Sequence, residues 1–151
     1  MDINSILVGI DFSEGSRAAF RYATELARRF GARTVLVHVI SDHDLKLVAS
    51  VSGEDEAQLL GRLRREAEQQ LRNFITDEGS SGLAAETLVC AGAPYQQIAL
   101  KARELAADLI VMGGGGMTRD RMAEAFFGST AEKVVRLMPC PVLCVPAKGG
   151  K

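Results

Sequence analysis

The chain has no tryptophan, and aromatic residues make up only 5% of its 151 residues. Proteins that bind single-stranded nucleic acids stack the bases on exposed aromatic rings, so this composition disfavours such a platform. Basic side chains are not in excess either, because 18 Lys and Arg residues stand against 19 Asp and Glu residues. Neutralising nucleic-acid phosphates needs a surplus of basic charge. We therefore expect no nucleic acid among the partners of this protein.

Cysteine is scarce as well, with only Cys90, Cys140 and Cys144 present. Their number is odd, they form no C-x-x-C pair and they lie in apolar stretches, which favours reduced, buried thiols over disulfides or metal ligands. The apolar run 6–10 is too short to span a bilayer, and residues 1–4 lack the basic segment that opens a signal peptide. We expect a cytoplasmic protein that does not insert into membranes.

Short apolar runs rich in β-branched residues alternate with longer helical patterns, as in parallel sheets with crossover helices. At this length and 47% apolar residues, residues 1–151 are predicted to form one domain. The predicted fold is α/β, a doubly wound five-stranded parallel sheet with helices on both faces. Strands are predicted over 6–10, 34–40, 85–90, 109–112 and 141–145. Helices are predicted after Ser13, after Gly53, from Pro94 and near Ser129, with a polar loop over 41–53.

Four consecutive glycines, 113–116, follow the fourth predicted strand. Such a run indicates backbone that adopts positive φ or approaches a ligand closely, and the alternative is a flexible surface turn. Further on, Ser129 and Glu132 form an S-x-x-E capping box, which predicts a helix start. Ligands of doubly wound sheets bind beyond the carboxyl ends of the strands, and a helix N-terminus favours an anion. The glycine run and the helix start together predict a phosphate site that needs no lysine.

The common phosphate-binding motifs are absent. The pattern GxxxxGK[ST] fails because Gly128 is followed by Ser129, and GxGxxG from Gly113 fails at Thr118. No GxSxG is present, and two histidines without an evident nucleophile make a catalytic triad improbable. The sequence therefore places no catalytic residue and disfavours a dinucleotide enzyme.

In combination, several segments resemble the universal stress proteins over nearly the whole chain. They are Ile6–Glu14, Leu36–Ile40, Gly92–Pro94, Ala107–Gly113, Gly128–Val135 and Pro139–Leu143. The resemblance implies a Rossmann-like fold of the adenine nucleotide alpha hydrolase type, with strand order 3-2-1-4-5. It also implies a cytoplasmic homodimer that binds ATP and acts in stress responses.

The ATP-binding members of that family share the pattern G-2x-G-9x-G-[ST]. Here Gly113 and Gly116 supply its first part, and Gly128 with Ser129 its last. The spacer Met117–Phe127 has eleven residues, two more than the pattern requires. Gly115 stands where many members carry histidine. The longer spacer must loop out or shift the phosphate site.

The resemblance also assigns roles to individual residues. Asp11 is expected to hold the adenosine end of the nucleotide, and Val39 to line the adenine pocket. Ribose and phosphates are expected to lie near Met112, Gly113 and Gly116, with phosphate oxygens on Gly128, Ser129 and Thr130. The complete expected binding set adds Gly9, Ile10 and Gly115.

The residues support one of these roles independently. A carboxylate at the end of the first strand, as at Asp11, can accept hydrogen bonds from ribose hydroxyls or an adenine amine. The alternative, a cap for the following helix, is compatible with it. Arg119 or Arg121 is expected to touch phosphate, or both belong to a solvated face.

Other polar groups have simpler interpretations. His38, inside an apolar strand, is interpreted as a core or crevice histidine. His43 with its flanking aspartates is interpreted as solvated rather than as a metal site. The last strand, Val142–Val145, is bracketed by prolines, which sheet edges tolerate, so it is predicted to pair with a second copy in a two-fold dimer.

Together these features predict an adenine-nucleotide-binding regulator or sensor, with ATP, ADP or AMP as ligand, with or without Mg²⁺. One alternative is a slow Mg²⁺-dependent ATPase or phosphotransferase. The other is a nucleotide-free dimeric interaction module in which the longer spacer has closed the phosphate site.

Overall fold

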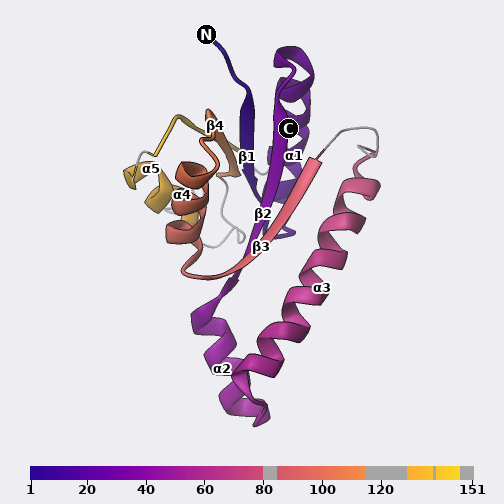
Figure 1. The fold of residues 1–151 in the computed structure, drawn as a ribbon, viewed down its shortest axis with the longest axis vertical. Helices are drawn as coiled ribbons and strands as arrows, with labels where there is room; N and C mark the ends of the chain where they lie inside the picture. The colour runs from indigo at the N-terminus through magenta and orange to yellow at the C-terminus, as the bar shows by residue number, and fades with distance from the viewer. Residues whose placement is uncertain (80–84, 115–128, 138, 147–151) are drawn as a thin grey trace.

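The computed structural model describes residues 1–79, 85–114, 129–137 and 139–146. Its five strands form one all-parallel sheet in the order β3-β2-β1-β4-β5, which confirms the predicted fold and strand order (Figure 1). The strands are β1 (Ser5–Gly9), β2 (Arg33–Ser41), β3 (Ala85–Gly92), β4 (Leu109–Gly113) and β5 (Val142–Val145). The helices are α1 (Glu14–Phe30), α2 (Asp42–Ser52), α3 (Glu56–Asp77), α4 (Pro94–Glu104) and α5 (Ser129–Leu137).

Helices cover both faces of the sheet, α1 and α3 on one side and α4 and α5 on the other (Figure 1). Successive strand residues point to opposite faces, so β1 sends Ile6 and Val8 toward α1 and α3, and Leu7 toward α4 and α5. All of β1 is buried. Burial on both faces explains why this strand is apolar throughout.

Local signals fix the ends of two helices. Ser13 caps α1 by accepting a hydrogen bond from the Ser16 N–H, and Gly31 ends the helix at φ +66°. Pro94 occupies the first turn of α4, where its missing N–H costs nothing. The predicted helix starts after Ser13 and at Pro94 are confirmed.

The prediction of a loop over residues 41–53 was wrong, because most of this segment forms α2. Ser41 caps the helix through the Asp44 N–H, and Gly53 ends it at φ +75°. Only Leu45 and Ala49 of the helix are buried, one turn apart, against Leu59 of α3. The apolar residues of this segment (45, 47–49 and 51) are spread around the helix instead of forming one stripe, so they show too weak a helical period to predict α2.

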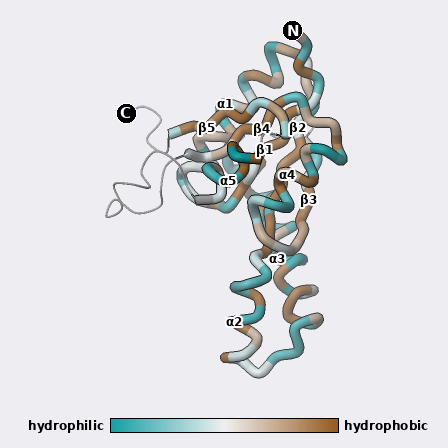
Figure 2. The backbone as a smooth tube through the Cα atoms, turned by 90° about the vertical axis from the view of Figure 1, so that its left-hand side faces the viewer, coloured by the Kyte–Doolittle hydropathy of each residue, from teal (hydrophilic) through white to brown (hydrophobic). Residues whose placement is uncertain are grey.

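Helix α2 and the N-terminal half of α3 project from the sheet as a helical arm, here called the α2–α3 arm (Figures 1 and 2). Its own small apolar cluster is built from Leu45, Ala49 and Leu59, with Leu60 and Leu63 packed against it. The arm therefore has a separate core, beyond the sheet.

The three cysteines are free thiols. Cys90 is buried as predicted, whereas Cys140 and Cys144 are only partly buried. Desolvation by burial raises the pKa of all three thiols, which keeps them protonated at neutral pH. Across the part of the chain that the structure describes, no helix is long and apolar enough to cross a bilayer.

Candidate functional site

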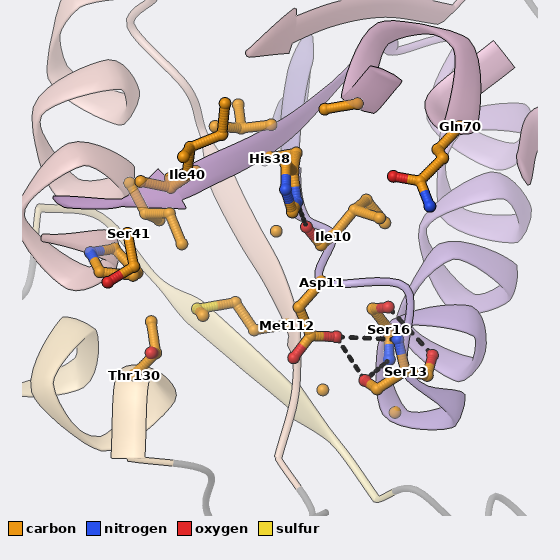
Figure 3. A pocket seen from close by; sticks show the side chains of 18 of the residues that line it. Ile10, Asp11, Ser13, Ser16, His38, Ile40, Ser41, Gln70, Met112 and Thr130 are labelled. Atoms are coloured by element: carbon orange, nitrogen blue, oxygen red, sulfur yellow. Dashed lines mark hydrogen bonds between the residues drawn. The ribbon is translucent and has the colours of Figure 1, made fainter. Parts of the chain in front are cut away.

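A cavity of about 520 Å³ opens beyond the carboxyl ends of the central strands (Figure 3). Its walls come from β1, β2 and β4, from the first turns of α1, α2, α4 and α5, and from α3. This is the point where the strand order reverses, since β1 has β2 on one side and β4 on the other. In open α/β sheets ligands bind at this point.

Most of the predicted binding residues that the structure describes line this cavity. They are Gly9, Ile10, Asp11, Val39, Met112, Gly113 and Thr130. Gly115, Gly116 and Gly128 lie outside the described residues, as do Arg119, Arg121 and the spacer 117–127. For Ser129 the structure describes the backbone, as the first residue of α5. Residues from the ends of three strands and from one helix are thus brought together, as the sequence predicts.

Asp11 is held at the cavity by a tight turn. Phe12 adopts a left-handed backbone conformation, φ +66°, which is unusual for a residue other than glycine. The turn lets the Ser13 N–H donate to the Asp11 carboxylate at 3.0 Å, and the Ser13 hydroxyl donates to the same oxygen. Ser13 in turn caps α1 (Figure 3). Asp11 therefore orients the cap residue Ser13 and does not itself cap the helix, so the alternative interpretation of Asp11 as the helix cap was wrong.

Gly113 allows β4 to meet the start of α1 directly. A Cβ atom at this position would lie 2.6 Å from the Gly15 carbonyl carbon and 2.8 Å from its oxygen, which is backbone that cannot move aside. Gly15 and Gly113 both line the cavity. The first glycine of the run therefore has a packing role at the site, which was not among the roles predicted from the sequence: positive φ, close approach to a ligand or a flexible turn.

His38 is a crevice histidine, as predicted. Its Nδ1 lies 2.8 Å from the Ile10 carbonyl oxygen, so Nδ1 carries the proton and donates (Figure 3). The ring packs against Phe12, with 4.8 Å between ring centroids. In the neutral ring, Nε2 is then a hydrogen-bond acceptor.

Helix α3 supplies one wall of the cavity, which the sequence analysis missed. Its lining residues Leu63, Glu66, Ala67 and Gln70 recur at helical spacing and so share one face. That spacing is visible in the sequence, but the same pattern also describes an ordinary core-facing stripe. Ser16 and Ile98 also line the cavity and were not predicted to belong to a site.

Helix α5 directs its first turn at the cavity through Thr130 and Ala131. The predicted capping partner, the Glu132 carboxylate, lies 3.7 Å from Arg136 one turn further along the helix. Among the described residues, no group of three or more His, Cys, Asp or Glu side chains is arranged to hold a metal ion.

A doubly wound parallel sheet with a cavity at the point where the strand order reverses defines a Rossmann-like domain. The chain belongs to the universal stress protein family, whose model matches residues 3–146. A relative from Bacillus subtilis, universal stress protein YxiE, is 30% identical over 94% of this chain and 98% of its own length.

Solved structures share the fold over nearly the full length. Protein MJ0577 of Methanocaldococcus jannaschii is 26% identical with a TM-score of 0.78, over 96% of both chains. UspA of Lactobacillus plantarum is also 26% identical, with a TM-score of 0.74 over 95% of this chain and 98% of its own. More distant neighbours include a universal stress protein in complex with cAMP, 21% identical with a TM-score of 0.63 over 97% of this chain and 99% of its own. A universal stress protein from Archaeoglobus fulgidus in complex with dAMP is 24% identical, with a TM-score of 0.65 over 95% of this chain and 98% of its own.

Proposed function

We propose that this protein is a cytoplasmic regulator or sensor that binds an adenine nucleotide in the cavity at the carboxyl edge of its sheet. One observation carries the proposal. One cavity is lined by residues from the loop after β1, from β2, from β4 and from α5, namely Asp11, Val39, Met112, Gly113 and Thr130. They are positions at which the sequence resemblance places nucleotide contacts.

The size and lining of the cavity fit a ligand of this kind. A volume of about 520 Å³ lies within the range of small-molecule sites, roughly 300–1,000 Å³. Apolar side chains such as Val39, Ile98 and Met112 can enclose a flat base, and hydroxyl and carboxylate groups also line the cavity. Two neighbours that share the fold have been solved with cAMP and with dAMP, which supports an adenine nucleotide as the ligand here.

Each polar group suits one part of the nucleotide. The Asp11 carboxylate, fixed by the Ser13 N–H, can accept from the ribose hydroxyls. Thr130, in the first turn of α5, lies where backbone N–H groups and the helix dipole favour phosphate. ATP, ADP and AMP, with or without Mg²⁺, all belong to the proposed ligand class.

The experiment is isothermal titration calorimetry of the full chain with AMP, ADP and ATP. Asp11→Asn keeps the side-chain oxygen that accepts from Ser13 but removes the charge. We expect nucleotide affinity to fall about tenfold, because hydrogen bonds to a charged acceptor are stronger than neutral ones. Asp42→Asn is the matched control, since Asp42 is exposed on α2 and does not line the cavity. The proposal fails if none of the three nucleotides binds the wild-type protein.

A further inference from the structure

Helix α2 presents a row of apolar side chains to solvent. Its buried residues Leu45 and Ala49 face α3. Leu47, Val48 and Val51 lie on the other side of the helix, with exposed fractions of 57%, 46% and 82%. Spacings of three and four residues place these three on one face, here called the α2 apolar face. Surfaces normally carry single exposed apolar residues, whereas a gathered row marks an interaction site.

Acidic residues flank the α2 apolar face at both ends. From position 42 to 56 the sequence has five acidic side chains and a single basic one, Lys46. Asp42 and Asp44 stand in the first turn of α2, and the acidic run 54–56 follows the end of the helix. Among the described residues, neither aspartate of the first turn forms an ion pair. Their charges are therefore available to a partner.

The arginines at the start of α3 do not offset this charge. Arg62 is paired with Glu54 at 2.9 Å, so neither group is free for another ion. Arg64 donates to a backbone carbonyl of β3 at 2.7 Å. Arg65 comes two residues after Leu63, which packs toward α2, and so lies on the opposite side of α3. The surroundings of the α2 apolar face are thus negative.

This charge decides which kind of partner fits. A second copy of the chain would bring the same five carboxylates against those already present. The cytoplasmic surface of a membrane is negative as well, so it would also be repelled. A protein segment with basic side chains beside an apolar stripe matches both features. Its apolar residues would cover the α2 apolar face, and its cations would meet the acidic flanks.

The geometry of the face favours a helical segment. The backbone N–H and C=O groups inside a helix are already paired, so α2 offers no edge to which an extended peptide could add as a strand. Side chains at spacings of three and four form a ridge, and such ridges pack into the grooves of a second helix. Helix α2 already packs against α3 through its opposite face. A second helix along the α2 apolar face would complete its burial.

We propose that the α2 apolar face is a docking site for a basic amphipathic helix of a partner protein. The anchors are Leu47, Val48 and Val51, and the cations of the partner lie against the acidic residues at the two ends of α2. None of the three anchors lines the nucleotide cavity, so the inference does not depend on the proposed function. It adds the surface through which a regulator acts on another protein.

The test uses a fluorescein-labelled synthetic peptide of about 18 residues, or five helical turns, with leucine at spacings of three and four and lysine elsewhere. Fluorescence anisotropy measures its binding to the full chain. We expect binding that weakens about tenfold or more when salt is raised from about 50 to about 500 mM. A peptide with the same leucines and glutamate in place of lysine should bind at least about tenfold more weakly.

The double variant Leu47→Ser/Val51→Ser removes two anchors and should weaken binding of the lysine peptide about tenfold or more. The matched control is Leu100→Ser/Leu137→Ser, because these two leucines are also exposed but lie on α4 and α5. We expect the control to bind the peptide as the wild type does. All four side chains are exposed, so both variants should fold, which urea denaturation checks.

The acidic flanks are tested by Asp42→Asn/Glu56→Gln, which should weaken binding of the lysine peptide about threefold to tenfold and reduce its salt dependence. Absence of binding to the wild type would overturn the proposal. Equal affinity for the lysine and glutamate peptides, or equal binding to wild type and Leu47→Ser/Val51→Ser, would do the same.

Light scattering and vesicles test the other occupants of this face. A lower mass of Leu47→Ser/Val51→Ser than of the wild type would show that a second copy covers the α2 apolar face, and would overturn the proposal. Co-sedimentation of the wild type, but not of this variant, with phosphatidylserine vesicles would assign the face to a membrane instead. We expect equal masses and no co-sedimentation.

Discussion

Gly113 joins the end of β4 to the first turn of α1 at the rim of the cavity. The space for its side chain is taken by the backbone of Gly15, which an added Cβ atom would approach to 2.6 Å. Two backbones in such close contact cannot separate without moving a strand or a helix. The position of the cavity wall therefore depends on this residue being glycine.

We expect Gly113→Ala to lower the free energy of unfolding by about 2–4 kcal/mol, because the strand and helix must separate. Gly61→Ala is the control, since Gly61 lies inside α3 with only the Arg65 side chain near its Cβ position. There alanine should stabilise the protein by about 0.5–1 kcal/mol. Urea denaturation of both variants measures the difference. An unchanged free energy of unfolding in the Gly113→Ala protein would contradict the packing role of Gly113.

Glu78, just beyond α3, joins that helix to α1. Its side chain is 7% exposed and accepts from Arg17 at 3.0 Å and from Arg21 at 2.7 Å. Burial by itself raises the pKa of this carboxyl, but the hydrogen bonds and charges of the two arginines outweigh it and lower the pKa below its ordinary value. The interaction therefore stabilises the folded chain in its ionised form.

We expect Glu78→Gln to lower the free energy of unfolding at pH 7 by about 1–2 kcal/mol. The contribution of the carboxylate is complete above the unfolded-state pKa, about 4.3, and is lost as the pH falls through the lower folded-state pKa. The difference between wild type and variant should thus shrink in acid, as urea denaturation at pH 7 and below pH ~4 can measure. Glu86→Gln is the control, because its pair with Arg33 is exposed and 3.7 Å long. An equal loss at both pH values would argue against the ion pair.

At the scale of elements, the α2–α3 arm differs from the rest of the fold. Its cluster of Leu45, Ala49 and Leu59 is small, whereas the cluster beneath α1 and α3 contains fifteen buried residues. On the outer face of α2, Leu47, Val48 and Val51 are exposed. Few buried contacts predict that α2 opens locally at a lower free energy than the sheet.

We expect Leu45→Ala to speed amide hydrogen exchange in α2 about tenfold or more and to leave exchange in β1 unchanged. Leu71→Ala is the comparison, because Leu71 is fully buried in the cluster beneath α1 and α3. That change should lower global stability by about 2–5 kcal/mol and speed exchange throughout. Faster exchange in β1 of the Leu45→Ala protein would show that the arm unfolds together with the sheet.

At the scale of the whole molecule, β5 is an outer strand of the sheet. Within the described chain it pairs with β4 on one side only, and Val142, Leu143 and Cys144 are partly exposed. An apolar edge strand invites pairing with another chain, which agrees with the sequence-based proposal of a two-fold dimer.

We expect light scattering at micromolar concentration to give about twice the chain mass of 16.2 kDa. Antiparallel pairing of two β5 strands would complete the hydrogen bonds along the open edge and cover its apolar side chains. A monomeric mass under these conditions would contradict the dimer. The same protein diluted to nanomolar concentration provides the control. A dimer of moderate affinity that pairs through its edge strands should dissociate on dilution, so the measured mass should fall toward that of one chain.

Much of the fold could be predicted from the sequence, because its signals are local. Apolar runs such as 6–10 identify buried strands, and Ser13, Gly31 and Pro94 mark helix ends by their own backbone chemistry. Helix α2 escaped prediction because two buried positions are too few to show a period. Its two buried residues pack against Leu59 of the next helix.

The sequence by itself determined the strand positions, the family and the group of residues around Asp11, Val39, Met112 and Gly113. These residues lie at or just beyond the carboxyl ends of parallel strands, and those ends must meet at one edge of the sheet. Only the tertiary structure decided what stands opposite them. The α3 wall with Glu66 and Gln70 and the close contact of Gly113 with Gly15 depend on distances between elements far apart in the chain. No local pattern encodes such distances, because the angle at which a helix crosses a sheet is set by packing of the whole core.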